Sequence, residues 1–106
     1  EQARADEDES EVWLGTFRSR LKGVQYYTGT ITEMEMVKMM REPNNPYDGN
    51  AIRVDNVSGR QIGHVDRAHA SVLSPLLDKK WIKAEGTVPS GSKNVFVCPL
   101  DIYIFS

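Results

Sequence analysis

The 106-residue sequence predicts a small, mainly β domain, an OB-like antiparallel β-barrel of about six strands with one or two short helices. Three observations predict this fold. Short runs of alternating apolar and polar residues recur along the chain, turn-forming residues separate them, and one longer segment has the features of a helix. A chain of this length supports one domain with a single hydrophobic core.

The N-terminal segment differs in composition from the rest of the chain. Residues 1–11 contain six acidic residues and one basic residue, without an aromatic residue or an apolar period. We therefore predict an acidic disordered flank over residues 1–11 and a folded domain over residues 12–106. The whole chain has a net charge of −2, but twelve bases remain against nine acids once the flank is set aside. A mildly basic domain favours compact contacts with nucleic acid over contacts with many phosphates.

Several classes of protein are excluded by composition. No apolar run approaches the roughly 20 residues of a membrane-spanning helix, so we expect no membrane role. Residues 1–11 lack the basic and apolar regions of a secretory signal. The single cysteine, Cys98, cannot form an internal disulfide and fits a reducing compartment such as the cytosol or nucleus. Because Cys98 lies in an alternating pattern, we expect a buried thiol rather than a nucleophile.

The first half of the domain is predicted to be rich in strands. Alternation over residues 12–18 predicts a strand, and residues 21–24 are expected to bend into a second strand through the β-rich segment 25–32. Segment 33–41 fits a period of 2 or of 3.6. Its four methionines favour a helix, whereas the surrounding β pattern favours a strand, which we prefer. Two prolines and three asparagines predict a loop over residues 42–50.

The second half contributes a predicted hairpin and two final strands. Residues 51–55 and 60–65 alternate in polarity around a turn, which predicts a β-hairpin. Residues 81–88 and 94–105 predict the last two strands. Pro99 cannot donate a ladder hydrogen bond, so we expect a strand edge or a bulge near it.

A helix is predicted between the hairpin and the last two strands. Asp66 lies where an N-cap is expected, ahead of residues 67–78. Pro75 is expected to kink this helix or to begin a new turn. The predicted apolar face consists of Ala68, Val72 and Leu76, with Leu73 and Leu77 beside them.

The sequence lacks the patterns of common catalytic and metal sites. His64 and His69 lie five residues apart without a companion Cys or His cluster, so metal-ligand spacing is absent. No phosphate-binding glycine loop occurs. A hydrolase that uses His64, Asp48 and Cys98 stays open on residue types alone, but no nucleophile motif supports it. We expect no catalytic residue, no metal and no cofactor.

Aromatic and amide residues are concentrated in the predicted loops. Tyr26, Tyr27 and Tyr47 lie beside turn residues, and exposed rings on a barrel surface can stack on unpaired bases. Asn45 supplies amide donors suited to phosphates or base edges, and the Asp48 carboxylate can accept a hydrogen bond from a sugar hydroxyl. This combination favours a binding module.

Each of these residues also has a purely structural interpretation. In a strand, one of Tyr26 and Tyr27 points inward, and Tyr47 can simply pack over its own loop. The loop asparagines and aspartate can be turn formers. His64 can be a hydrogen-bonded structural histidine, and Arg67 can be solvated in the first turn of the helix. Residue types alone leave both interpretations open.

Four motifs of the chain resemble those of the HIRAN family. The central match is NNPYDGNAIRV at residues 44–54, followed by IGHV at residues 62–65. Further matches are YYTG at residues 26–29 and NVFVCPL at residues 94–100. The resemblance extends over residues 12–105 and agrees with the predicted barrel.

The resemblance implies a function in DNA metabolism. It implies a nuclear, monomeric, non-catalytic module at the N-terminus of a SNF2-type DNA translocase. The module would bind the 3′-hydroxyl end of single-stranded DNA and direct the translocase to stalled replication forks for fork regression. The parent protein would be an ATP-dependent translocase, with ubiquitin ligase activity as a further option. The alternative is a protein-interaction module of a chromatin or DNA-repair protein, without 3′-end specificity.

The resemblance also implies roles for individual residues. Tyr26 and Tyr47 would sandwich the terminal base, Asp48 would accept a hydrogen bond from the 3′-hydroxyl, and Asn45 would help to hold the terminal nucleotide. Phe96 would stack on the neighbouring base. The full set of expected DNA-binding residues is Gln25, Tyr26, Tyr27, Asn45, Tyr47, Asp48, His64, Arg67 and Phe96.

The charged contacts depart from the family pattern at two positions. His64 and Arg67 would contact a backbone phosphate, with Arg67 in place of a lysine, which keeps the charge. Gln25 stands where a relative has arginine, so one cationic contact is lost, and Asp66 adds a negative charge nearby. We expect the loss at Gln25 to lower the affinity by about 1 kcal/mol rather than to alter the mode of binding, and Asp66 to act in the same direction.

Overall fold

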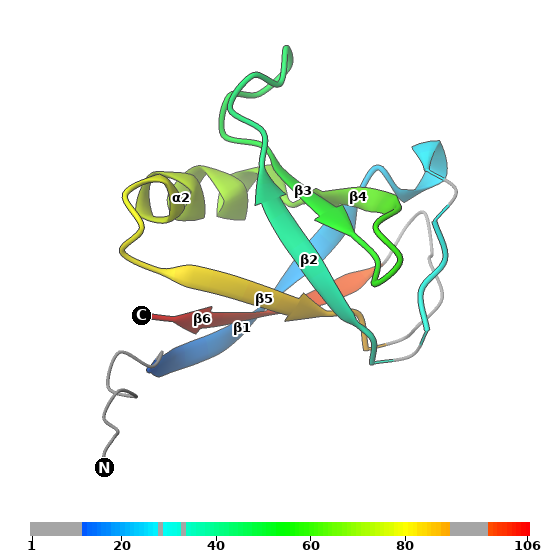
Figure 1. The fold of residues 1–106 in the computed structure, drawn as a ribbon. Helices are drawn as coiled ribbons and strands as arrows, with labels where there is room; N and C mark the ends of the chain where they lie inside the picture. Colours follow the sequence, from blue (N-terminus) through cyan, green and yellow to red (C-terminus); the bar gives the residue numbers. More distant parts are fainter. Residues whose placement is uncertain (1–11, 28, 33, 90–97) are drawn as a thin grey trace.

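The structure, a computed structural model, contains six β-strands. It describes residues 12–27, 29–32, 34–89 and 98–106. In chain order the elements are β1 (Trp13–Lys22), the 3-10 helix η1 (Val24–Tyr26), β2 (Met36–Arg41), β3 (Ile52–Asp55), β4 (Gln61–Val65), α2 (Arg67–Asp78), β5 (Lys83–Thr87) and β6 (Pro99–Phe105) (Figure 1). The predicted acidic flank, residues 1–11, lies outside the described residues.

The strands close into a barrel in the order β1-β4-β3-β2-β5-β6, and every pair is antiparallel. The predicted fold class, a small antiparallel β-barrel, is confirmed. Since β6 lies between β1 and β5, the strand edge expected near Pro99 is wrong. Pro99 begins β6 opposite Arg20, where a missing ladder donor is tolerated. The register shifts among the described strand pairs lie at residues 13–15 and 54–55.

The barrel interior is filled by alternate side chains of the strands and by one stripe of α2. Each fully buried aliphatic side chain stabilises the fold by about 1.5–3 kcal/mol. Cys98 is 2% exposed, which confirms the prediction of a buried thiol. The buried apolar residues of the core are Leu21, Val24, Val37, Ile52, Val54, Ile62, Val65, Ala70, Leu73, Val88, Cys98, Leu100 and Ile102.

The connection from β1 to β2 differs from the prediction. A single strand continues to Lys22, and the chain then turns through η1 instead of forming a second strand over residues 25–32. Gly23 has φ 74°, a left-handed conformation that favours glycine and reverses the chain direction. Val24 is buried beneath this turn. The local pattern of β-favouring residues does not reveal that Val24 is buried in the core from a helical turn.

The methionine segment and the hairpin follow the prediction. Residues 36–41 form β2, so the preference for a strand is confirmed. β3 and β4 pair around a turn in which Asn56 Oδ1 accepts hydrogen bonds from the amides of Ser58 at 3.0 Å and Arg60 at 2.9 Å. A side chain thereby replaces missing backbone partners in the turn.

The predicted helix is confirmed, whereas its predicted apolar face is confirmed only for Leu73, which is buried, and Leu77, which packs against the core. Asp66 caps α2 by accepting a hydrogen bond from the Ala68 amide at 2.9 Å. The helix continues through Pro75 to Asp78, so Pro75 begins no new turn. The buried residues of α2 are Ala70, Leu73 and Ser74, whereas Ala68 and Val72 are exposed and Leu76 is half-buried.

A polar contact explains why the apolar pattern of α2 misled. The buried Ser74 hydroxyl donates to the Asn50 carbonyl at 2.6 Å, which satisfies both groups and ties α2 to the loop after β2. Two small residues, Ala70 and Ser74, also let the helix approach the barrel closely. Counting apolar residues could not find a face that includes a serine.

The last two strands are confirmed where they are described, β5 and β6. The predicted turn at residues 89–93 and the beginning of the last strand fall largely within residues 90–97, outside the described residues. Among the described helices, none has the length and apolar character needed to cross a membrane.

Candidate functional site

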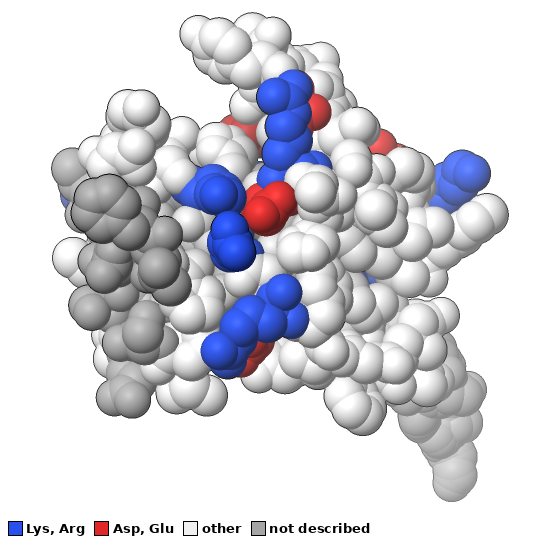
Figure 2. Space-filling view, turned by 180° about the vertical axis from the view of Figure 1, so that it is seen from behind, with Lys and Arg blue, Asp and Glu red and all other residues white. Residues whose placement is uncertain are grey.

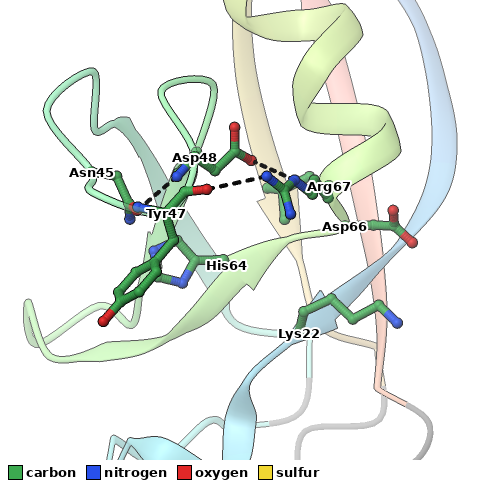
Figure 3. A pocket seen from close by; sticks show the side chains of 9 residues that line it. Lys22, Asn45, Tyr47, Asp48, His64, Asp66 and Arg67 are labelled. Carbon is green, nitrogen blue, oxygen red and sulfur yellow. Dashed lines mark hydrogen bonds and ion pairs between the residues drawn. The ribbon is translucent and has the colours of Figure 1, made fainter.

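A cavity of about 520 Å³ opens where the end of β1, the loop between β2 and β3, β4 and the start of α2 meet (Figure 3). This volume falls within the range of about 300–1,000 Å³ that is typical of ligand pockets. We call it the first cavity. It is lined by Lys22, Asn45, Tyr47, Asp48, Ala51, His64, Val65, Asp66 and Arg67.

Side-chain hydrogen bonds fix the loop that forms one wall of the first cavity. Asn45 Oδ1 accepts from the amides of Tyr47 at 2.9 Å and Asp48 at 3.1 Å. Asp48 Oδ1 in turn accepts from the Asn50 amide at 2.9 Å. Asn45 is therefore a turn former, as its structural interpretation held, and the turn it forms positions the two residues that follow.

Arg41 holds the same loop from behind. Its guanidinium donates to the carbonyls of Gly49 at 2.9 Å and Ala51 at 2.8 Å, and it pairs with Asp78 of α2 at 2.9 Å. The Arg41 side chain is 15% exposed and its bond to the Ala51 carbonyl is part-buried, whereas its bonds to Gly49 and Asp78 are exposed. A loop fixed in this way presents its side chains with little ordering left to occur on binding.

Tyr47 projects from this loop into solvent. The residue is 87% exposed, and Figure 3 shows its ring at the mouth of the first cavity beside His64. Its carbonyl accepts a hydrogen bond from Arg67 Nη2 at 3.1 Å. The structure thus contradicts packing of Tyr47 over its own loop and leaves one aromatic face available to a ligand.

Asp48 and Arg67 form the charged part of the first cavity. Arg67 Nε lies 3.5 Å from Asp48 Oδ2, with the arginine side chain 76% exposed and the aspartate side chain 21% exposed. An ion pair with one exposed partner contributes at most about 1 kcal/mol. The Arg67 head group is therefore available to a phosphate, and the Asp48 carboxylate keeps acceptor capacity toward a hydroxyl.

His64 is held in place by Glu42. Its Nε2 lies 2.6 Å from Glu42 Oε1, and the Asn45 side-chain amide donates to the same oxygen at 3.2 Å. Partial burial raises the pKa of Glu42, but hydrogen bonds from His64 and Asn45 and the charges of His64 and Arg53 outweigh it and lower this pKa. The bond to Glu42 therefore fixes the His64 ring at the wall of the first cavity.

The η1 turn carries the remaining aromatic residues. Tyr27 is half-buried and packs edge-on against His64, with ring centroids 6.0 Å apart. Tyr26 is 77% exposed, and Gln25 is exposed as well. Neither lines the first cavity, although η1 packs against β4, which does.

The structure therefore brings most, but not all, of the expected residues together. Asn45, Tyr47, Asp48, His64 and Arg67 line one cavity. Tyr27 is joined to it through His64, whereas Tyr26 and Gln25 lie on η1. Phe96 lies outside the described residues.

Sequence reasoning missed Lys22 as part of the cavity wall. Lys22 pairs in register with His64 where β1 meets β4, so barrel closure places it beside the histidine. The two strands approach closely here because Gly63 has no Cβ. A Cβ at Gly63 would lie only 2.5 Å from the Lys22 carbonyl oxygen. The alternation of side chains along β1 predicts that Lys22 points outward. It does not predict the pairing of Lys22 with His64, which lies more than 40 residues further along the sequence.

No catalytic or metal constellation emerges from the residues that the structure describes. None of them form a cluster of three or more His, Cys, Asp or Glu side chains that could hold a metal ion. Cys98 is buried and does not line the first cavity, and His64 is engaged with Glu42. These positions leave the hydrolase hypothesis without geometric support.

Comparisons with known proteins assign the family. A family model described as the HIRAN domain matches residues 14–105. The chain belongs to the HIRAN family. The resemblance found in the four motifs is thus confirmed, and the match includes every predicted site residue of this HIRAN domain.

The curated relatives are much longer proteins. The HIRAN domain is 47% identical over 96 residues to the helicase-like transcription factor of Mus musculus, a match that covers 91% of this chain and 10% of that protein. It is 45% identical over 96 residues to the helicase-like transcription factor of Homo sapiens, with the same coverage. The chain spans about a tenth of the length of these relatives.

Solved structures share the fold. The crystal structure of the HIRAN domain of human HLTF has a TM-score of 0.85 and 43% identity, and covers 91% of this chain and 79% of that chain. An NMR structure of the HLTF HIRAN domain in its DNA-bound conformation has a TM-score of 0.81 and 42% identity, with coverages of 96% and 84%. A Lactobacillus plantarum protein, at 22% identity and a TM-score of 0.71, shares the fold alone.

Proposed function

We propose that this HIRAN domain is a DNA-binding module that captures the 3′-hydroxyl end of a single strand in the first cavity. The observation that carries the proposal is the Asp48 carboxylate, fixed at the cavity wall between an exposed aromatic ring and an exposed guanidinium. Membership of a family in which a relative has been determined in a DNA-bound conformation supports DNA as the ligand.

The terminal base would stack on Tyr47. A ring that is 87% exposed on a fixed loop offers a π-face to any base, and such stacking contributes about 1–3 kcal/mol per base. Tyr26, 77% exposed on η1, would supply the second face. Phe96 would stack on the next base. Stacking alone predicts tolerance of base identity.

Selectivity for a free 3′ end would come from Asp48. Its carboxylate accepts a hydrogen bond from a hydroxyl but repels a phosphate at the same position, whether that phosphate ends the strand or continues it. Asp48 Oδ1 is already engaged with the Asn50 amide, and Oδ2 faces Arg67. The carboxylate is thereby fixed in direction, which favours one sugar position over others.

Phosphate contacts would come from Arg67 and His64. Both line the first cavity, and the bond to Glu42 holds the His64 ring in place. Asn45 would help to hold the terminal nucleotide through its fixed turn. The neutral Gln25 and the acidic Asp66 would keep the affinity moderate.

The role of the parent protein is a further step of the same proposal. The domain would act without catalysis or cofactor, as a monomer and in the nucleus. By gripping the 3′ end of a nascent strand, it would direct an attached SNF2-type, ATP-dependent translocase to stalled forks for fork regression. The alternative of a protein-interaction module is motivated by the low net charge and by a strand edge near Pro99, and the closed barrel does not provide that edge.

Binding to matched oligonucleotides tests the proposal. Fluorescence anisotropy with a short strand that ends in a 3′-hydroxyl, and with the same strand ending in a 3′-phosphate, should give at least about fivefold tighter binding to the hydroxyl form, because two like charges near the surface repel by about 1–4 kcal/mol. Equal affinities would contradict capture of the 3′ end, and absence of any binding would contradict a DNA-binding function.

A further inference from the structure

A second cavity of about 580 Å³ adjoins the first cavity, and Asp66 lines both. It follows the outer surface of β1 toward the beginning of β6. Figure 1 shows the second half of β1 passing behind β2 and β5, and thus on the face that Figure 2 presents. The second cavity is lined by Arg18, Ser19, Arg20, Asp66, His69 and Pro99.

Alternation along β1 places a row of cations on this surface. Arg18, Arg20 and Lys22 are exposed, whereas Ser19 and Leu21 between them are buried. Residues two apart on a strand are separated by about 6.6–6.8 Å and share one face. Lys22 lines the first cavity and Arg20 the second, so the row connects the two.

The cations of this row differ in their partners. Arg18 is neutralised by Asp101, with bonds of 2.7 and 3.1 Å from its guanidinium to the two carboxylate oxygens. Arg20 and Lys22 form no ion pair with any residue that the structure describes. Unneutralised positive charge is therefore concentrated at Arg20 and Lys22. Figure 2 shows Lys and Arg side chains gathered along the middle of this face, around an acidic one.

Asp66, the acidic residue that lines both cavities, has part of its charge offset by its role as the N-cap of α2. Asp66 accepts a hydrogen bond from the Ala68 amide and caps α2, where the positive end of the helix offsets part of its charge. A phosphate beside Asp66 therefore experiences less repulsion than beside a free carboxylate, and Lys22 and Arg20 are available on the β1 side.

We propose that the nucleotides preceding the captured 3′ end run from the first cavity into the second along β1, with their phosphates against Lys22 and Arg20. This inference rests on the proposed function, because a strand whose last nucleotide occupies the first cavity must leave it in the 5′ direction. Arg20 is then a DNA contact that end recognition itself does not require. The path makes affinity depend on the length of the strand as well as on its end.

A length series measures this path. Anisotropy titrations of the domain with oligothymidylates of two to about eight nucleotides, all ending in a 3′-hydroxyl, should show tighter binding as length increases. Arg20→Gln should weaken the longest strand by about 3- to 10-fold, the scale of one exposed charged contact. It should leave the dinucleotide unchanged, because Arg20 does not line the first cavity. Its slope of log K against log salt should fall by about 0.7 for a single strand.

Lys38→Gln provides the matched control. Lys38 is an exposed cation of β2 that lines neither cavity, so its loss changes the net charge equally without touching the path. We expect both lengths to bind Lys38→Gln like the wild type, and thermal melts to show that both variants fold. Length-independent binding of the wild type, or equal effects of the two substitutions, would overturn the inference.

The end-selectivity assay separates failure of the path from failure of the proposed function. If the wild type prefers a 3′-hydroxyl over a 3′-phosphate but shows no length dependence, end capture stands and the path along β1 is wrong. If it binds both ends equally but Arg20→Gln still removes a length-dependent gain, β1 binds strands without end capture, and the path as a continuation of the captured end is overturned.

Discussion

Two sides of the candidate site, the loop that lines the first cavity and the η1 turn that does not line it, are held very differently. The loop over residues 42–51 is fixed by bonds from Asn45, Arg41 and Arg67 to its main chain. The η1 turn has main-chain bonds of 3.0 and 3.3 Å, the buried side chain of Val24 and the edge-on contact of Tyr27 with His64. The difference suits the two proposed roles. The Asp48 carboxylate must point in one direction to accept a hydrogen bond, whereas Tyr26 needs only an exposed ring for stacking.

The largest effect is expected from removing the exposed ring of the fixed side. Tyr47→Ala should weaken binding of a 3′-hydroxyl oligonucleotide by about 1–3 kcal/mol, since one stacking platform is lost. The melting temperature should not change, because the ring is 87% exposed. Trp81→Ala is the control, an aromatic residue 61% exposed that lines neither cavity. Equal losses in the two variants would contradict a specific role for Tyr47.

The next effect concerns the support of the loop. Arg41→Gln should lower the free energy of unfolding by about 0.5–1.5 kcal/mol, because it removes the guanidinium bonds to the Gly49 and Ala51 carbonyls, although the Ala51 carbonyl keeps the bond from the Glu42 amide. DNA affinity should fall as well, although Arg41 does not line the first cavity. Urea unfolding and anisotropy measure the two effects. Arg18→Gln, which breaks an exposed ion pair with Asp101, should leave stability almost unchanged. Unaltered DNA binding in a destabilised Arg41→Gln would show that loop rigidity is dispensable.

Low pH should destabilise the fold partly through Glu42, which is hydrogen-bonded to His64 and Asn45 of the first cavity. Its folded pKa lies below the ordinary 4.5, so below about pH 4.5 the unfolded chain binds more protons than the folded one. This contribution to stability is complete above that pH and is lost as the pH falls through the folded pKa. Urea unfolding at a series of pH values should therefore show a shallower acid loss in Glu42→Gln. Identical slopes for the variant and the wild type would contradict the bond to His64.

The smallest effect concerns the charge between the two cavities. Asp66→Asn keeps a good N-cap acceptor for α2, so the melting temperature should change little. Removal of one negative charge beside the phosphates should tighten DNA binding by about two- to threefold at low salt. The gain should fade as salt is added. Weaker binding would show that Asp66 contacts the DNA rather than repelling it.

The contrast between the two sides also explains what the sequence could predict. Prolines, asparagines and glycine mark the loop 42–50 because their backbone preferences are local, and Asp66 marks the start of α2 for the same reason. The η1 turn was mistaken for a strand, since burial of Val24 is decided by the barrel rather than by its neighbours. Lys22 entered the site only through pairing with His64 across the closed barrel.

The identities of the expected site residues came mostly from the family resemblance. Residue types alone left Tyr47 and Asn45 open between a binding role and a structural one. The structure shows that Asn45 forms the turn and Tyr47 is exposed. Asn45 has the structural role and Tyr47 has the exposed ring, although both belong to one loop. Sequence patterns alone did not show which residue has which role.

The most direct test of end capture combines the Asp48→Asn substitution with the choice of 3′ end. Affinities of the wild type and of Asp48→Asn are measured for one oligonucleotide ending in a 3′-hydroxyl or a 3′-phosphate. The account predicts at least about fivefold preference of the wild type for the hydroxyl, and loss of most of that preference in Asp48→Asn, which keeps a side chain of the same shape without its charge. An unchanged preference in the variant, or no preference in the wild type, would contradict it.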